Sequence, residues 1–253
     1  MDDETAPQET FLSHLIELRD RLIRCLVAVG IAFIPMFIYS AELYDLLARP
    51  VIASLPTGSR MIATGVITPF LIPMKIAAMA ALLAVLPFVL YQVWAFVAPG
   101  LYAHEKRLVL PLIVSSTVLF FVGMAFCYFF VFGAFFEFIN RWAPKSISVA
   151  PDIEAYFNFV LGMFLAFGVA FEIPVIVVVL AITGIVKIEQ LREWRGYVIV
   201  GIFVVAAIVT PPDVVSQISL AIPMCLLYEV GIFFAQLATR GKSAREAREG
   251  TAE

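Results

Sequence analysis

Long apolar runs with almost no charged side chain are the feature that most constrains this chain. A bilayer core about 30 Å thick is crossed by about 20 apolar helical residues, and several runs here reach that length. In lipid the backbone must satisfy its own hydrogen bonds, so runs of this kind predict helices. The 253 residues are 62% hydrophobic and 15% charged, whereas a soluble domain is about 25% charged. We therefore predict an all-α, polytopic membrane protein and not a soluble enzyme.

Six transmembrane helices are expected within one domain, residues 1–240, followed by a disordered cytoplasmic tail at residues 241–253. The expected spans are residues 22–42, 76–98, 108–136, 156–186, 196–211 and 214–238. We expect the last two helices to be short. About 15 helical residues before Pro211 extend only about 22 Å. This predicts either local thinning of the bilayer or a re-entrant hairpin.

The distribution of Lys and Arg predicts the orientation, because cytoplasmic loops collect these residues. Twelve of them lie on the side of the N-terminus and five on the other side. The five are Arg49, Arg60, Lys75, Arg141 and Lys145. We therefore expect both termini in the cytoplasm. The polar first ten residues do not resemble a cleavable signal peptide, so we expect the first helix to remain in the mature protein.

Two carboxylates lie inside expected spans. A charged side chain at the centre of a transmembrane helix costs about 2.5–3.5 kcal/mol on insertion scales. For Glu172 this favours a functional site over the alternative, a neutral carboxyl bonded to a neighbouring helix. Glu229 lies nearer the cytoplasmic half of its span, where snorkelling or bonding to another helix is the simpler explanation.

Two further carboxylates, Glu17 and Glu105, lie at the cytoplasmic edges of the first and third spans. Glu17 is followed by Arg19, and Glu105 by two basic residues. Surface ion pairs usually explain such clusters. Two carboxylates on one face, near Phe96, could instead accept a pair of guanidinium groups in bidentate fashion. The spacing alone leaves both interpretations open.

Other polar and aromatic residues have simpler interpretations. Asp213 follows two prolines and is expected to cap the start of the sixth span. Trp94 is expected at a membrane interface, where tryptophans gather. The sequence contains no phosphate-binding loop, nucleophile elbow or HExxH motif, so neither a cofactor nor a metal is expected. The net charge of -3 gives no indication of a nucleic-acid partner.

Two other classes of membrane protein fit less well. A secondary transporter of small solutes would have broken helices in matched repeats and a central polar site, yet no repeat is evident and Glu172 alone is central. An intramembrane hydrolase would need paired catalytic groups at membrane depth. A single glutamate does not supply them.

Several long segments resemble the TatC family, the core subunits of the twin-arginine protein translocase. They are HLIELRDRL at 14–22, MIATGVITPF at 61–70, YQVWAFVAPGLYAHEKR at 91–107, FGVAFEIPV and TPPDVVSQ. These segments occur in the family's order from the first helix to the last hairpin.

The resemblance implies a concave bundle in the bacterial inner membrane that binds the twin-arginine signal peptides of folded cargo on its cytoplasmic side. It implies TatB and TatA as single-span partners, a homo-oligomeric receptor complex, and transport driven by the proton-motive force. The family's signal-peptide site matches Glu17, Glu105 and Phe96 here, and we group Arg19 with them. An arginine pair offers two planar donor forks that two carboxylates can accept, so a lysine pair should bind less well.

Other positions are carried over from the same resemblance. The family's intramembrane glutamate corresponds to Glu172, on the concave face, and a proline of its first external loop corresponds to Pro50. Thr210 and Gln217 match a polar patch that docks partner helices. Ala207 stands where the family has a methionine in that patch.

Overall fold

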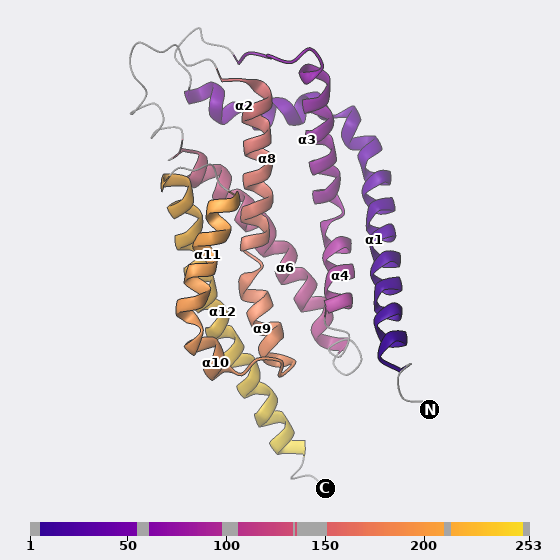
Figure 1. The fold of residues 1–253 in the computed structure, drawn as a ribbon, viewed down its shortest axis with the longest axis vertical. Helices are drawn as coiled ribbons and strands as arrows, with labels where there is room; N and C mark the ends of the chain where they lie inside the picture. The colour runs from indigo at the N-terminus through magenta and orange to yellow at the C-terminus, as the bar shows by residue number, and fades with distance from the viewer. Residues whose placement is uncertain are drawn as a thin grey trace. The chain divides into compact units, whose positions relative to one another are not determined.

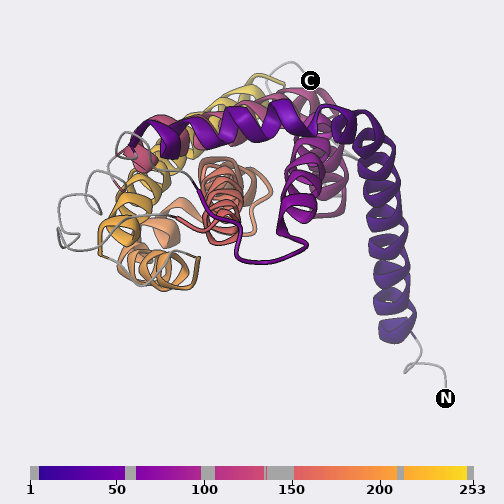
Figure 2. The ribbon, with the colours of Figure 1, turned by 90° about the horizontal axis from the view of Figure 1, so that it is seen from above.

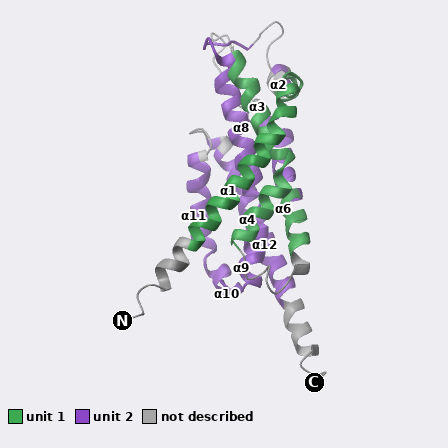
Figure 3. Cartoon of the chain, turned by 90° about the vertical axis from the view of Figure 1, so that its right-hand side faces the viewer, with its two compact units in different colours: residues 1–47, 69–117 green, residues 48–68, 118–253 purple. Residues whose placement is uncertain are grey.

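A computed structural model describes residues 6–54, 61–97, 106–133, 135, 151–209 and 214–249. These residues are almost entirely α-helical, and the only strand-like pairing among them is an isolated bridge between Ile62 and Asp152. The chain divides into two compact units, residues 1–47 with 69–117 and residues 48–68 with 118–253 (Figure 3). Each unit is described by itself.

The first unit is built from long apolar helices. Its elements are α1 (Ala6–Ile38), the first half of α2 (Ser40–Ser54), α3 (Thr68–Ala84), α4 (Leu86–Val97) and the first half of α6 (Lys106–Phe126). Helix α1 is continuous through Pro35, and the chain turns sharply between α1 and α2 (Figures 1 and 2). Within this unit α1 packs against α4.

Helices α3 and α4 form a bent pair, with an angle of 63° between them. The break lies at Val85, and Pro87 follows it. Proline has no backbone N–H and disfavours helical geometry at the preceding residue, which explains the bend. The two helices together are long and apolar enough to be one broken span.

Besides the second halves of α2 and α6, the described part of the second unit contains a π-helical segment and five helices. They are η1 (Cys127–Val131), α8 (Ile153–Ala170), α9 (Ile173–Ile182), α10 (Ile188–Glu193), α11 (Arg195–Val209) and α12 (Val214–Glu249). Helix α12 packs most extensively on α9 and also contacts α10 and α11. Val177, Tyr228 and Ile232 belong to the buried cluster between these helices.

The described part of the chain has the apolar helices of a six-helix membrane protein. Four helical segments are long and apolar enough to cross a bilayer: Ser13–Ile38, Val109–Val131, Ile153–Ile182 and Gln217–Thr239. The bent α3/α4 pair and the shorter apolar segment Arg195–Ile208 complete the set. The predicted all-α membrane fold is therefore confirmed.

Three details differ from the sequence prediction. The segment after the first expected span contains a helix, α2, over residues 40–54. Of the two last helices expected to be short, α11 has 15 residues but α12 has 36. Residues 241–249, assigned from the sequence to a disordered tail, are helical and continue α12. Alanine, glutamate, arginine and lysine dominate this segment and have high helix propensity, which explains the extension.

Candidate functional site

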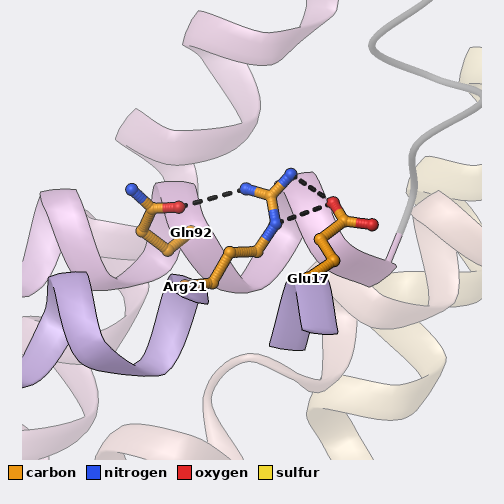
Figure 4. A network of polar contacts seen from close by, with 3 residues as sticks. All are labelled: Glu17, Arg21 and Gln92. Atoms are coloured by element: carbon orange, nitrogen blue, oxygen red, sulfur yellow. Dashed lines mark hydrogen bonds and ion pairs between the residues drawn. The ribbon is translucent and has the colours of Figure 1, made fainter. Parts of the chain in front are cut away.

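A network of three polar side chains joins α1 to α4 within the first unit (Figure 4). Arg21 donates to one oxygen of Glu17, Oε1, from Nε at 2.9 Å and from Nη2 at 2.6 Å. The remaining terminal nitrogen, Nη1, donates to Oε1 of Gln92 at 3.0 Å. Glu17 and Arg21 are four residues apart on α1, so their side chains lie on the same face of the helix.

Gln92 is a fixed acceptor in this network because it is buried, with 5% of its surface exposed. Two residues further along α4, the indole N–H of Trp94 donates to the hydroxyl of Ser116 on α6 at 2.9 Å. Both of these side chains are also buried. This part of α4 is therefore held to α1 by Gln92 and to α6 by Trp94. The prediction that Trp94 lies at a membrane interface did not anticipate this buried bond.

An aromatic stack lies at the same end of α1 and α4. The rings of His14 and Phe96 are 4.3 Å apart between centroids, with 19° between their planes. Phe96 is half-buried, while His14 is exposed. The stack places an apolar ring surface within one helical turn of Glu17, beside the carboxylate that carries the negative charge.

The chemistry that this arrangement supports is recognition of cations. The Glu17 side chain is 43% exposed, and Arg21 is 21% exposed. A carboxylate has about four acceptor positions, and Arg21 uses those of one oxygen. Both bonds from Arg21 go to Oε1, and the other oxygen, Oε2, points away from Arg21 in Figure 4. The site can accept a further hydrogen-bond donor from solution.

Two other residues expected at this site stand differently. Arg19 does not pair with Glu17; its guanidinium donates to the neighbouring Asp20 at 2.8 Å, and both side chains are exposed. Residues two apart on a helix do not face each other, which explains why Arg19 does not pair with Glu17. Glu105 lies outside the described residues.

Arg21 and Gln92 are not among the site residues predicted from the sequence. A Glu followed four residues later by an Arg is a recognised helix pair, so the sequence held a signal for Arg21. Gln92 is 71 residues from Arg21, and no local pattern could have joined them.

Glu172 lies at the break between α8 and α9 in the second unit and is 6% exposed. Its backbone N–H donates to the carbonyl of Val169 at 3.0 Å. The next helix, α9, begins at Ile173, and Pro174 lies in its first turn. A Cβ on Gly231 of α12 would lie 2.9 Å from the Cα of Pro174, so α12 approaches this break closely. Glu172 is thus buried within the helices of its own unit.

Two of the remaining predicted site residues, Gln217 and Pro50, lie in described helices. Gln217 on α12 donates from Nε2 to the carbonyl of Phe203 on α11 at 3.3 Å, so it joins the two helices. Thr210 and Asp213 lie outside the described residues. Pro50 falls inside α2, not in an irregular loop.

Glu229 bonds another helix, as the sequence predicted. It accepts from Nη2 of Arg195 on α11 at 2.6 Å, and both side chains are about half exposed. The neighbouring Tyr228 donates its hydroxyl to the carbonyl of Leu191 at 2.7 Å. These bonds connect α12 to α10 and α11. They give Glu229 and Tyr228 a structural role, and no catalytic role is needed to account for them.

A second polar cluster connects residues 61–68 to the start of α8. Asp152 caps α8 by accepting from the backbone N–H of Ala155 at 2.9 Å, and its other oxygen accepts from the hydroxyl of Thr64 at 2.7 Å. These bonds stabilise the charged form and lower the pKa of Asp152. Nearby, Thr68 donates to Glu154 at 3.0 Å. We call this set the Asp152 cluster.

No metal centre is found in the part of the chain that the structure describes: no three His, Cys, Asp or Glu side chains there lie close enough to share an ion.

Comparison with known proteins gives consistent matches. Residues 13–223 match the family described as Sec-independent protein translocase protein (TatC). The TatC protein of Escherichia coli K12 is 48% identical over 245 residues, which are 96% of this chain and 94% of that one. The TatC protein of Azotobacter chroococcum is 51% identical over 223 residues, 88% of each. A crystal structure of the twin-arginine translocase receptor TatC superposes with a TM-score of 0.78 at 38% identity, covering 89% of this chain and 99% of that one.

Proposed function

Because the chain belongs to the TatC family of Sec-independent protein translocase proteins, we propose that it is the receptor for twin-arginine signal peptides. As a member of that family it is a subunit of the Tat translocase, a transport protein, and a multi-pass protein of the bacterial inner membrane. The receptor role, the binding residues and the partners below are proposals.

The observation that carries the proposal is the Glu17 carboxylate, which already accepts a guanidinium from its own chain. A carboxylate arranged for one guanidinium is chemically suited to another. Arginine is charged at any physiological pH and presents a planar fork of donors, whereas lysine presents a compact ammonium. The first arginine of a signal peptide would bind at Glu17, and by family resemblance the second would bind at Glu105.

The apolar part of a signal peptide also has a surface to bind. Such peptides follow their basic residues with a short apolar stretch. Phe96 and His14 stack beside Glu17, and the exposed apolar side chains of α1, including Leu22 and Leu26, continue from this end into the membrane-spanning part. The basic residues of the peptide would bind at the Glu17 carboxylate, and its apolar residues would pack along α1.

Orientation and partners follow from the same proposal. The excess of Lys and Arg on the side of the N-terminus supports a cytoplasmic location of both termini and of Glu17. TatB and TatA are the proposed single-span partners, docking near Thr210 and Gln217, and the receptor complex would contain several copies of the chain. With no nucleotide motif in the sequence, the membrane potential supplies the energy, about 2.3 kcal/mol per charge per 100 mV.

Export in cells tests the receptor role. A strain lacking the protein is complemented with the wild type, with Glu17→Gln or with the matched control Asp20→Asn. A folded reporter carries either an Arg-Arg or a Lys-Lys signal. We expect Glu17→Gln to reduce Arg-Arg-dependent export strongly and Asp20→Asn to leave it near the wild-type level. Equal export by wild type and Glu17→Gln, at equal amounts of protein in the membrane, would refute the role of this carboxylate.

A further inference from the structure

We propose that Arg21 is a built-in competitor for the signal peptide: in the free protein its guanidinium occupies Glu17, and an incoming arginine must displace it. This inference rests on the proposed function and adds a regulatory contact to the same site. It concerns how tightly the site binds, not which residue binds.

The geometry supports displacement because Arg21 already occupies a carboxylate oxygen that the ligand would need. Two of its nitrogens, Nε and Nη2, donate to Glu17 Oε1, and the third donates to Gln92 Oε1. A bidentate pair with an incoming guanidinium needs both oxygens of the carboxylate, one donor to each. Oε1 is already occupied, so a bidentate pair can form only when Arg21 leaves it.

Gln92 can remain bonded to the Arg21 side chain after Arg21 has left Glu17. It is buried on α4, its amide oxygen is uncharged at every pH, and it holds Arg21 by a bond independent of Glu17. Arg21 can therefore release the carboxylate without losing every partner, and return when the peptide leaves. The contact keeps Glu17 neutralised between cargo molecules, so that stray cations do not occupy the site.

Competition makes a quantitative prediction. A competitor within the protein reduces the apparent affinity to the intrinsic affinity multiplied by the fraction of time that the site is free. Partly exposed ion pairs of this kind contribute up to about 1 kcal/mol, which corresponds to about a fivefold change in Kd. Removing Arg21 should therefore tighten binding of an arginine-pair peptide by about three- to fivefold.

Two substitutions separate competition from a general effect of charge. Arg21→Gln removes both the charge and the fork, whereas Arg21→Lys keeps the charge and loses only the fork. The matched control is Arg24→Gln, which removes one positive charge from an exposed side chain three residues away on the same helix. We expect Kd to fall in both Arg21 variants, more in Arg21→Gln, and to fall less in Arg24→Gln than in Arg21→Gln.

The measurement is fluorescence anisotropy with the full chain in nanodiscs and a labelled synthetic signal peptide carrying an Arg-Arg pair. Weaker binding in both Arg21 variants would overturn the inference, because it would mean that Arg21 positions Glu17 for the ligand. Unchanged binding in both would also overturn it. Arg21→Lys keeps the test valid if the neutral variant does not fold.

The same assay with Glu17→Gln distinguishes the two proposals. If Glu17→Gln weakens binding while neither Arg21 variant tightens it, the competitor is wrong and the receptor site stands. If Glu17→Gln leaves Kd unchanged, the proposed site itself is wrong.

Discussion

The buried hydrogen bond between Trp94 and Ser116 should be a measurable source of stability. It joins α4 to α6 within the first unit, with 2.9 Å between the indole nitrogen and the hydroxyl oxygen. Trp94 is 5% exposed and Ser116 is fully buried. Removing the hydroxyl with Ser116→Ala leaves the indole N–H buried without this acceptor, which should lower the free energy of unfolding.

The magnitude follows from how such bonds behave in membranes. Hydrogen bonds between transmembrane helices average about 0.6 kcal/mol in double-mutant cycles and reach about 1.7 kcal/mol. A buried donor left unsatisfied costs about 1–3 kcal/mol. We therefore expect Ser116→Ala to destabilise the protein by about 1–2 kcal/mol. The coupling energy between Ser116→Ala and Trp94→Phe should be about 0.6–1.7 kcal/mol.

The assay is equilibrium unfolding of the purified protein in mixed micelles, with the fraction folded followed as the proportion of SDS increases. Ser115→Ala is the matched control, because the Ser115 hydroxyl bonds the carbonyl of Leu112 in its own helix at 3.0 Å. We expect little change from this control. The reasoning would be refuted by a coupling energy below about 0.3 kcal/mol or by equal losses in the Ser115 and Ser116 variants.

The remaining predictions use the same unfolding assay. Gly123→Ala should destabilise the protein by about 1–3 kcal/mol, because its Cβ would lie 2.5 Å from the backbone oxygen of Phe167. The control is Gly162→Ala, which should not destabilise the protein, because its Cβ would meet no neighbouring atom within 4 Å. A stable Gly123→Ala variant would contradict this close approach. The pKa of Asp152 is lower in the folded protein than its ordinary value of 3.8. The ionised Asp152 therefore stabilises the fold above pH 3.8, and this stabilisation is lost as the pH falls through the lower folded pKa. Asp152→Asn should therefore be less stable than the wild type at neutral pH and should lose less stability on acidification below about pH 4; identical pH profiles would contradict the role of the Asp152 cluster.

The class of fold could be predicted from the sequence because a membrane-spanning helix is recognised by its mean hydropathy over about 20 residues. The apolar runs gave the helices, and Pro87 and Pro174 mark the two breaks within them. Helix α2 could not be predicted from long apolar runs, because it is short and only partly apolar. Its apolar residues Leu43, Leu46 and Leu47 recur at helical spacing, a pattern typical of an amphipathic helix.

The polar contacts could be predicted only where they are local. Glu17 and Arg21 are one helical turn apart, so their pairing was available from the sequence, although Arg19 was chosen instead. The bond from Arg21 to Gln92 depends on how α1 packs against α4, and hydropathy contains no information about that packing. The bond from Trp94 to Ser116 is of the same kind. These non-local bonds decide how the candidate site is built.

The most direct test of the central claim is to map where a signal peptide binds. A peptide with a photoreactive residue beside its Arg-Arg pair is cross-linked to the full chain in inner-membrane vesicles, and the adducts are located by mass spectrometry. The account predicts adducts at the N-terminal part of α1, residues 13–24, and at the end of α4 near Phe96, all reduced by Glu17→Gln. Adducts confined to α8–α12, or unchanged by Glu17→Gln, would contradict it.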